Sequence, residues 1–155
     1  MDGRQARDRA VAAAEPVLSA LLSELVQTVP GAMMGCLSSV EPVRLSLHTD
    51  HRAAAIDADQ IRAGTGPCVE VMRTRRATHA DITQVRLCWP RFARAAREAR
   101  VFSFLVVPIA RSPRLSGALS LYGGHSHAFV DSDLATASSA MPGIRRRLLD
   151  IAHLR

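Results

Sequence analysis

Two apolar stretches within residues 101–122 dominate the hydrophobic pattern of the chain. The first, residues 101–107, is rich in β-branched and aromatic side chains, which favours a strand. Pro108 can close that strand because proline donates no hydrogen bond to a ladder. The second, residues 116–122, alternates small or polar residues with leucines at the period of two expected of a strand. With a turn at residues 111–114, the pattern predicts a buried strand pair that other segments must cover on both faces.

The remaining segments show helical and strand periodicities in turn. Leucines and valines recur at i, i+3, i+4 and i+7 in the first helix, whereas residues 43–47 alternate apolar and polar side chains. Asp50 and Pro67 suit the starts of two helices, and we expect the pair Pro142 and Gly143 to kink or break the last helix. The predicted elements are helix 10–29, strands 32–40 and 43–50 joined at Glu41 and Pro42, helices 52–61 and 68–75, strand 77–82, loop 83–88, helix 89–99, strands 101–107 and 116–122, and a helix from 131 to 151.

This order of elements predicts an α+β fold with a central, mainly antiparallel sheet. We expect helices from the two ends of the chain to cover one face of the sheet and the short middle helices to cover the other. At 155 residues, the chain is expected to form a single domain over 1–155, with a core over about 15–150.

Localisation and partners are constrained by composition. We find no apolar run that approaches the length of a membrane span and no signal peptide, so we expect a cytoplasmic protein with no membrane partner. The three cysteines are widely spaced, which favours reduced thiols. The net charge of +6 would suit nucleic acid, but the arginines are scattered apart from residues 145–147 and aromatic residues are few, so a nucleic-acid partner is disfavoured.

Five motifs carry a family resemblance. They are GTGPC from residue 64, WPRF from 89, FSFLVVPI from 102, GALSLY from 117 and FxDxDL from 129. In this order and spacing the chain resembles a GAF domain over roughly residues 15–150, in particular the actinobacterial type that precedes an ANTAR RNA-binding domain. The resemblance implies a GAF fold and a regulatory module that binds a small molecule, or dimerises, and passes a change to an output domain. No such domain follows the last helix, so the output is expected to be missing, supplied by a partner protein in trans, or removed from this chain.

The resemblance also suggests a ligand site beneath the helix of residues 89–99, which roofs the pocket in GAF domains. An aromatic pair there could stack on a flat ligand, and nearby sheet residues could add polar contacts. The alternative is that Trp89 and Phe92 are ordinary core residues, which the low aromatic content favours. The candidate ligand-binding residues are Trp89, Phe92, Cys68, Ser103, Ser120 and Tyr122.

Cys68 supports two opposing interpretations. Its place at the start of a short helix would lower the thiol pKa and favour a reactive thiolate. Packing as a small apolar residue under the glycine loop is the interpretation we prefer, because buried free cysteine is common. Together with Cys88, its placement resembles that of cysteines in free methionine-(R)-sulfoxide reductases, which share the GAF fold, although the third cysteine of that family has no counterpart among residues 56–62.

The functional prediction is therefore a sensor of a small molecule or of redox state in signal transduction or transcription control, and not an enzyme. It would relay its input through the terminal helices of a homodimer or to a partner. Two alternatives stay open: a thiol-dependent sulfoxide reductase using Cys68 and Cys88, and a ligand-free dimerisation module whose dimer would be lost when Leu18, Leu22 or Leu148 becomes charged. The sequence identifies no cofactor, and the pair of histidines at 125 and 127 has no further ligand at metal-binding spacing.

Overall fold

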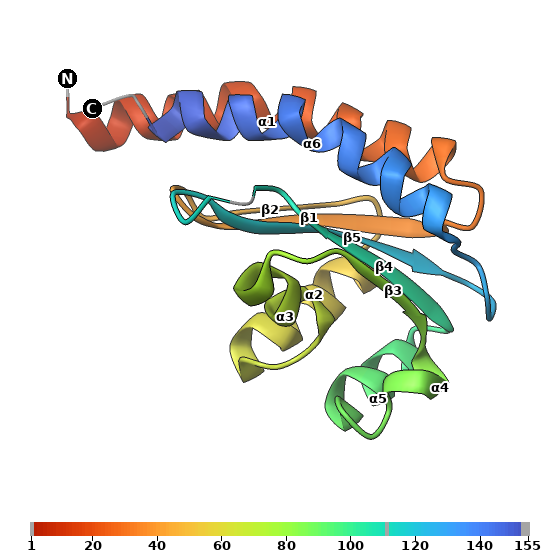
Figure 1. Cartoon of the computed structure of the whole chain (residues 1–155). Coiled ribbons are helices and arrows are strands. Elements are labelled where there is room, and N and C mark those ends of the chain that lie inside the picture. Colours follow the sequence, from red (N-terminus) through yellow and green to blue (C-terminus); the bar gives the residue numbers. More distant parts are fainter. Residues whose placement is uncertain (1, 111, 153–155) are drawn as a thin grey trace.

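The computed structural model of the chain describes residues 2–110 and 112–152 and has three layers (Figure 1). A pair of long helices lies on one face of a five-stranded sheet, and four shorter helices lie on the other. The elements in chain order are α1 (Gly3–Thr28), β1 (Met34–Glu41), β2 (Leu45–His48), α2 (His51–Ala63), α3 (Pro67–Thr74), β3 (Thr78–Asp81), α4 (Ile82–Val85), α5 (Pro90–Glu98), β4 (Ser103–Pro108), β5 (Ser116–Gly123) and α6 (Asp131–Ala152).

The sheet has the strand order β2-β1-β5-β4-β3, and every neighbouring pair is antiparallel. The predicted strand pair is β4 and β5, which places Leu105 opposite Leu121, and β5 is the central strand of the sheet. The predicted α+β class is confirmed, as is the division of the helices between the two faces. Residue 111, in the predicted turn, lies outside the described residues.

The side chains of each strand point alternately to the two faces of the sheet, which gives the protein two separate hydrophobic cores. Leu37, Leu105 and Leu119 face α1 and α6 in one hydrophobic cluster. Cys36 and Tyr122 face the middle helices in the other, because successive side chains of a strand point to opposite faces. The three central strands β1, β5 and β4 therefore contribute side chains to both layers of helices.

The long helix α1 packs on the sheet through Leu18, Leu22 and Leu25, which are buried. By length and composition it could also cross a membrane, since one 18-residue window has a mean hydropathy of 1.3. This differs from the expectation from the sequence, which was that no apolar run approaches the length of a membrane span. Only 17% of this window is buried, and that share includes leucines of α1 that pack against the sheet.

Local signals explain most helix boundaries. The Asp50 carboxylate accepts a hydrogen bond from the backbone N–H of Arg52 at 2.9 Å and caps α2, and Pro67 is the first residue of α3. Two expectations are wrong. The predicted loop 83–88 begins with the short helix α4, where the Gln84 side chain accepts from the backbone N–H of Asp81. Helix α6 does not break at Pro142, because buried residues on either side of the proline keep one stripe against the sheet.

Candidate functional site

A cluster of hydrogen-bonding side chains is buried between the sheet and the middle helices. Asp57 and Gln60 project from α2, and each is only 1 % exposed. Tyr122 projects from β5 and is 0 % exposed. Charged and amide side chains are rarely buried to this degree without partners, so the cluster must satisfy its own donors and acceptors.

Tyr122 is at the centre of this hydrogen-bond network. Its hydroxyl donates to Oδ1 of Asp57 in a short hydrogen bond and accepts from Nε2 of Gln60 at 3.3 Å. Oε1 of Gln60 accepts from the backbone N–H of Cys68 at 2.8 Å, which ties the end of α2 to the start of α3. A side chain at Gly66 would collide with Gln60, so this glycine allows the loop between the two helices to close over the amide.

The β1 and β5 strands complete the cluster. The Ser38 hydroxyl lies 3.4 Å from Oδ2 of Asp57, to which it donates, and 3.6 Å from Sγ of Cys36. Ser120 lies beside Asp57 and Cys68, yet its fully buried hydroxyl makes no well-formed hydrogen bond. The cluster therefore retains one buried hydroxyl that could bind a ligand.

Burial controls the protonation of the cluster. It raises the pKa of the Asp57 carboxyl, while the hydrogen bond from Tyr122 acts in the opposite direction. Burial and then the neighbouring Asp57 charge hold the pKa of Tyr122 well above its usual value of 10.0. The tyrosine therefore stays a hydrogen-bond donor over the ordinary pH range.

The cysteines are divided between interior and surface. Cys36 and Cys68 are buried in the same hydrophobic cluster, whereas Cys88 is exposed. Burial raises the pKa of the Cys68 thiol, and the nearby Asp57 charge raises it further. The preferred interpretation, a small residue packed under the glycine loop, agrees with the burial of Cys68, and the alternative of a pKa lowered by the helix terminus does not, because desolvation outweighs the dipole of an eight-residue helix.

The other candidates from the sequence lie in two places. Phe92 packs edge-on against Phe104, with ring centroids 5.4 Å apart, and Trp89 packs edge-on against Phe92 at 6.5 Å. These rings fill the hydrophobic cluster next to the polar one. Ser103 lies apart from both. It points to the same face of the sheet as Leu105, two residues along β4. Its hydroxyl donates to the backbone carbonyl of His125 at 2.9 Å.

Sequence reasoning missed the α2 half of the cluster. Asp57 and Gln60 share the helical stripe of Ala53 and Ile56, which are also buried. Polar residues at core positions of an amphipathic helix are a recognisable signal of a buried network. Cys36 was noted only as a free thiol, although the β1 pattern places it on the same face.

A surface hollow approaches the cluster beside β1. It has a volume of about 270 Å³ and is bordered by Ser38, Ser46 and Ile61 among others. Ser38, which borders this hollow, also donates to the buried Asp57 carboxyl. Within residues 2–110 and 112–152, no group of three His, Cys, Asp or Glu side chains is arranged to hold a metal ion.

Comparison with solved structures gives the same fold in proteins of different function. The GAF domain region of a membrane protein from Geobacter sulfurreducens PCA has a TM-score of 0.66 at 14% identity, over 91% of this chain and 96% of that one. The type II free methionine-R-sulfoxide reductase of Thermoplasma acidophilum has a TM-score of 0.64 at 15% identity, over 92% and 96%. The GAF domain of a two-component sensor histidine kinase from Bacillus halodurans has a TM-score of 0.60 at 10% identity, over 88% and 93%.

The sequence comparisons identify the family. The search of curated proteins finds no match. The family model described as GAF domain matches residues 12–145, which include every element from β1 to β5 and most of the two terminal helices. The chain therefore belongs to the GAF domain family.

Proposed function

We propose that the protein is a regulatory sensor domain that binds a small molecule at the Asp57–Tyr122 cluster and relays binding through α1 and α6. The observation that carries the proposal is the buried Asp57 carboxyl, which Tyr122 and Ser38 hydrogen-bond between the sheet and α2. A ligand polar group that enters from the hollow beside Ser38 could join this network.

The sheet offers a direct route from input to output. Tyr122 and Ser120 of β5 face the cluster, whereas Leu119 and Leu121 of the same strand pack under the terminal helices. A ligand that shifts β5 must therefore alter the packing of both layers. Control still requires that the ligand bind two arrangements with different affinities.

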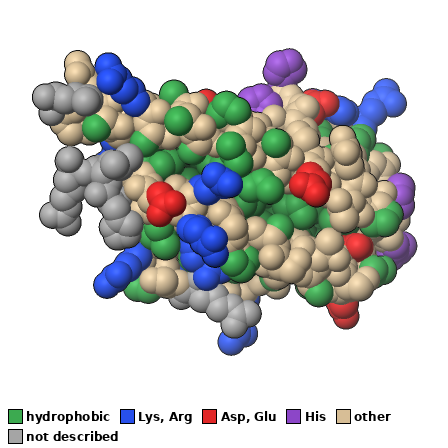
Figure 2. Space-filling model, turned by 90° about the horizontal axis from the view of Figure 1, so that it is seen from above, with side chains coloured by type: hydrophobic (Ala, Val, Ile, Leu, Met, Phe, Trp, Pro, Cys, Tyr) green, Lys and Arg blue, Asp and Glu red, His purple; other side chains and the backbone are tan. Residues whose placement is uncertain are grey.

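The output surface is the outer face of α1 and α6, where hydrophobic side chains gather in the middle (Figure 2). Leu18, Leu22 and Leu148, on which the alternative of a ligand-free dimerisation module relied, are buried in the monomer core instead. The exposed apolar residues of α1 include Ala13, Val17 and Ala20, and Val17 is 38 % exposed. We propose that a second copy, or an output protein in trans, packs on this surface in signal transduction or transcription control.

The reductase alternative is less well supported. An attacking thiol must reach its substrate as a thiolate. Cys68 is 0 % exposed and its pKa is raised, so neither condition is met in this conformation. The buried thiols also suit a reducing compartment, and we propose a cytoplasmic location.

Native mass spectrometry of freshly purified protein, compared with its denatured mass, tests the sensor function first. Mass that leaves on denaturation identifies a bound ligand. Its affinity should fall at least about tenfold in Asp57→Asn. Asp59→Asn is the matched control, because this half-buried carboxylate on the same helix lies outside the cluster and pairs with Arg91 at 2.8 Å. Equal affinity in both variants, or no ligand from any lysate or metabolite mixture, would favour the dimerisation module.

The output surface is tested by the molar mass in solution. Val17→Arg should convert a dimer to a monomer without unfolding it, because a charge on an apolar interface must be desolvated. Leu87→Arg is the control, since Leu87 is 91 % exposed and lies between α4 and α5, which cover the opposite face of the sheet (Figure 1). A dimer that survives Val17→Arg would move the interface elsewhere.

A further inference from the structure

Two adjacent hollows lie beside α4 and α5, the helices on the side of the sheet opposite α1 and α6 (Figure 1). Their volumes are about 440 Å³ and about 200 Å³. Leu87 lines the larger hollow and Phe102 the smaller one, whereas Arg86 and Arg97 line both. The two arginines therefore lie where the hollows meet, and each hollow has an exposed apolar side chain of its own.

The apolar side chains are presented to solvent by a fixed backbone. Leu87 is 91 % exposed and Phe102 is 44 % exposed. Both backbone groups of Phe102 are hydrogen-bonded, its N–H to the carbonyl of Gly123 and its carbonyl to the N–H of Ile82, each at 2.9 Å. The connection that carries Leu87 is likewise fixed, because the backbone N–H of Cys88 donates to a carbonyl of α4 at 3.0 Å. A partner that covers these side chains would therefore lose little backbone entropy in ordering them.

The cations of this surface are unused by the protein. Within residues 2–110 and 112–152, the side chains of Arg86, Arg94 and Arg97 form no hydrogen bond or ion pair. By contrast, Arg91 of the same helix α5 already pairs with Asp59 at 2.8 Å. The described lining of the two hollows thus carries three arginines that can donate to carboxylates, against a single glutamate.

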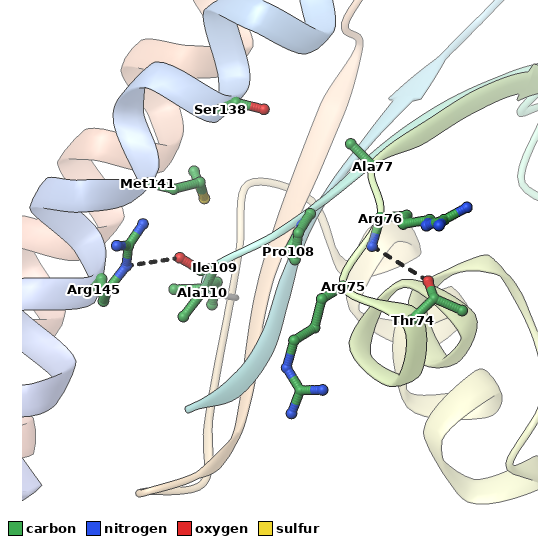
Figure 3. A pocket seen from close by; sticks show the side chains of 10 residues that line it. All are labelled: Thr74, Arg75, Arg76, Ala77, Pro108, Ile109, Ala110, Ser138, Met141 and Arg145. Carbon is green, nitrogen blue, oxygen red and sulfur yellow. Dashed lines mark hydrogen bonds between the residues drawn. The ribbon is translucent and has the colours of Figure 1, made fainter. Parts of the chain in front are cut away.

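Convergence of charge distinguishes this surface from an arginine-lined hollow of about 760 Å³ between α6 and the α3–β3 connection (Figure 3). There, the side chains of Arg75 and Arg145 extend apart on opposite sides of residues 108–110, and Arg145 donates to the backbone carbonyl of Ile109 at 3.2 Å. That hollow offers no position shared by its cations. Arg86 and Arg97 border the same two hollows, so a carboxylate at their common rim is attracted by both.

Arginine beside exposed apolar and aromatic side chains is typical of protein interfaces. A flat bilayer surface would leave the hollows unfilled, and nucleic acid would gain little from the aliphatic side chain of Leu87. A peptide chain carries apolar side chains and carboxylates at short spacing. We propose that this surface binds an acidic, amphipathic segment of a partner protein, with apolar side chains in the two hollows and carboxylates at Arg86, Arg94 and Arg97.

Random short peptides displayed on phage and selected on the native protein are the probes. Enriched sequences should combine aspartate or glutamate with large apolar residues, and a fluorescein-labelled enriched peptide should bind saturably when followed by fluorescence anisotropy. Arg97→Gln and Leu87→Ser should each weaken binding at least about tenfold. Both positions are exposed, so the thermal midpoint should stay within about 2 °C of the wild type.

Two variants serve as matched controls. Leu87→Met keeps an apolar side chain at the same position, and Arg146→Gln removes an exposed arginine from α6, across the sheet. Each should change peptide affinity less than about threefold. Equal weakening by Arg97→Gln and Arg146→Gln would show a response to net charge alone and would overturn the proposal.

Cys88 localises the bound peptide, because it follows Leu87 and is exposed while the other two cysteines are buried. Peptide at about ten times its Kd should slow the modification of Cys88 by Ellman's reagent about tenfold. Enrichment of no acidic peptide, affinity unchanged in Arg97→Gln and Leu87→Ser, or unaltered modification of Cys88 would each contradict the proposal. Phosphatidylglycerol vesicles or single-stranded DNA that bind at Arg97 where no peptide does would assign the surface to a membrane or to nucleic acid instead.

Discussion

Replacing Tyr122 with phenylalanine removes one oxygen atom from the buried cluster and leaves the ring packing intact. The lost hydroxyl donates to Asp57 and accepts from Gln60. Gln60 keeps a second acceptor, the backbone carbonyl of Ile56 at 3.4 Å, so most of the loss falls on Asp57. A hydrogen bond to a charged group contributes about 1.5–3 kcal/mol, and we expect the free energy of unfolding to fall by about 2–3 kcal/mol near neutral pH.

The cost should depend on pH with a definite sign. Burial already raises the Asp57 pKa above its value of 3.8 in the unfolded chain, and loss of the Tyr122 hydrogen bond raises it further. A carboxyl whose pKa is higher in the folded than in the unfolded state makes its full contribution to stability below the unfolded pKa. That contribution is lost as the pH rises through the folded pKa, by up to about 1.4 kcal/mol per pH unit. The folded pKa of Asp57 is higher in the variant, so its deficit relative to the wild type, measured at one mildly acidic and one mildly alkaline pH, should be larger at the higher pH.

Urea denaturation followed by the fluorescence of Trp89, the single tryptophan, measures the deficit. Asp57→Asn supplies the second corner of a double-mutant cycle, in which Tyr122→Phe should cost about 1 kcal/mol at every pH because no charge is present. Ser120→Ala is the control, and it should cost less than about 1 kcal/mol because the Ser120 hydroxyl lacks a well-formed bond. A deficit below about 0.5 kcal/mol that is the same at both pH values would refute the reasoning.

Three further predictions concern how closely individual side chains are surrounded by other atoms. Since Tyr122 is the single tyrosine and its pKa is raised well above 10.0, the native protein should show no tyrosinate absorbance at about pH 10.5, whereas the urea-unfolded chain should show it. Ellman's reagent should modify Cys88 rapidly in the native state and reach Cys36 and Cys68 only on unfolding; fast reaction of a second thiol would contradict their burial. Gly143→Ala should raise the free energy of unfolding by about 0.5–1 kcal/mol, because a Cβ there meets no atom within 4 Å, and a loss on thermal melting would show hidden crowding.

The sequence predicted the fold well because the elements are strongly periodic. The β-branched and aromatic run of β4, the alternation of β5 and the leucine stripe of α1 are local patterns that survive in the structure. The surface against which an apolar helix stripe packs depends on the whole fold and cannot be predicted from the local sequence. Leu18 and Leu148 could equally have met a second copy or the sheet, and only the three-dimensional packing assigns them to the core.

The candidate site was recoverable only in part. Tyr122 and Ser120 alternate with Leu121 along β5 and so point to the face that the middle helices cover, and both lie in the cluster. Ser103 has the opposite parity from Phe104 and so lies on the other face of the sheet. Asp57 escaped notice because a carboxylate is normally assigned to solvent, although its spacing from Ala53 places it on the buried side of α2.

The edge strands β2 and β3 are only four residues long each, at opposite borders of the sheet. An exposed edge is a template on which another chain can add a strand, and such addition leads to aggregation. Edges this short offer few free backbone groups, and β3 also carries His79 and Asp81, which disfavour stacking of identical copies. We therefore expect the protein to tolerate high concentration without forming β-rich aggregates, and association to proceed through side chains on its helices.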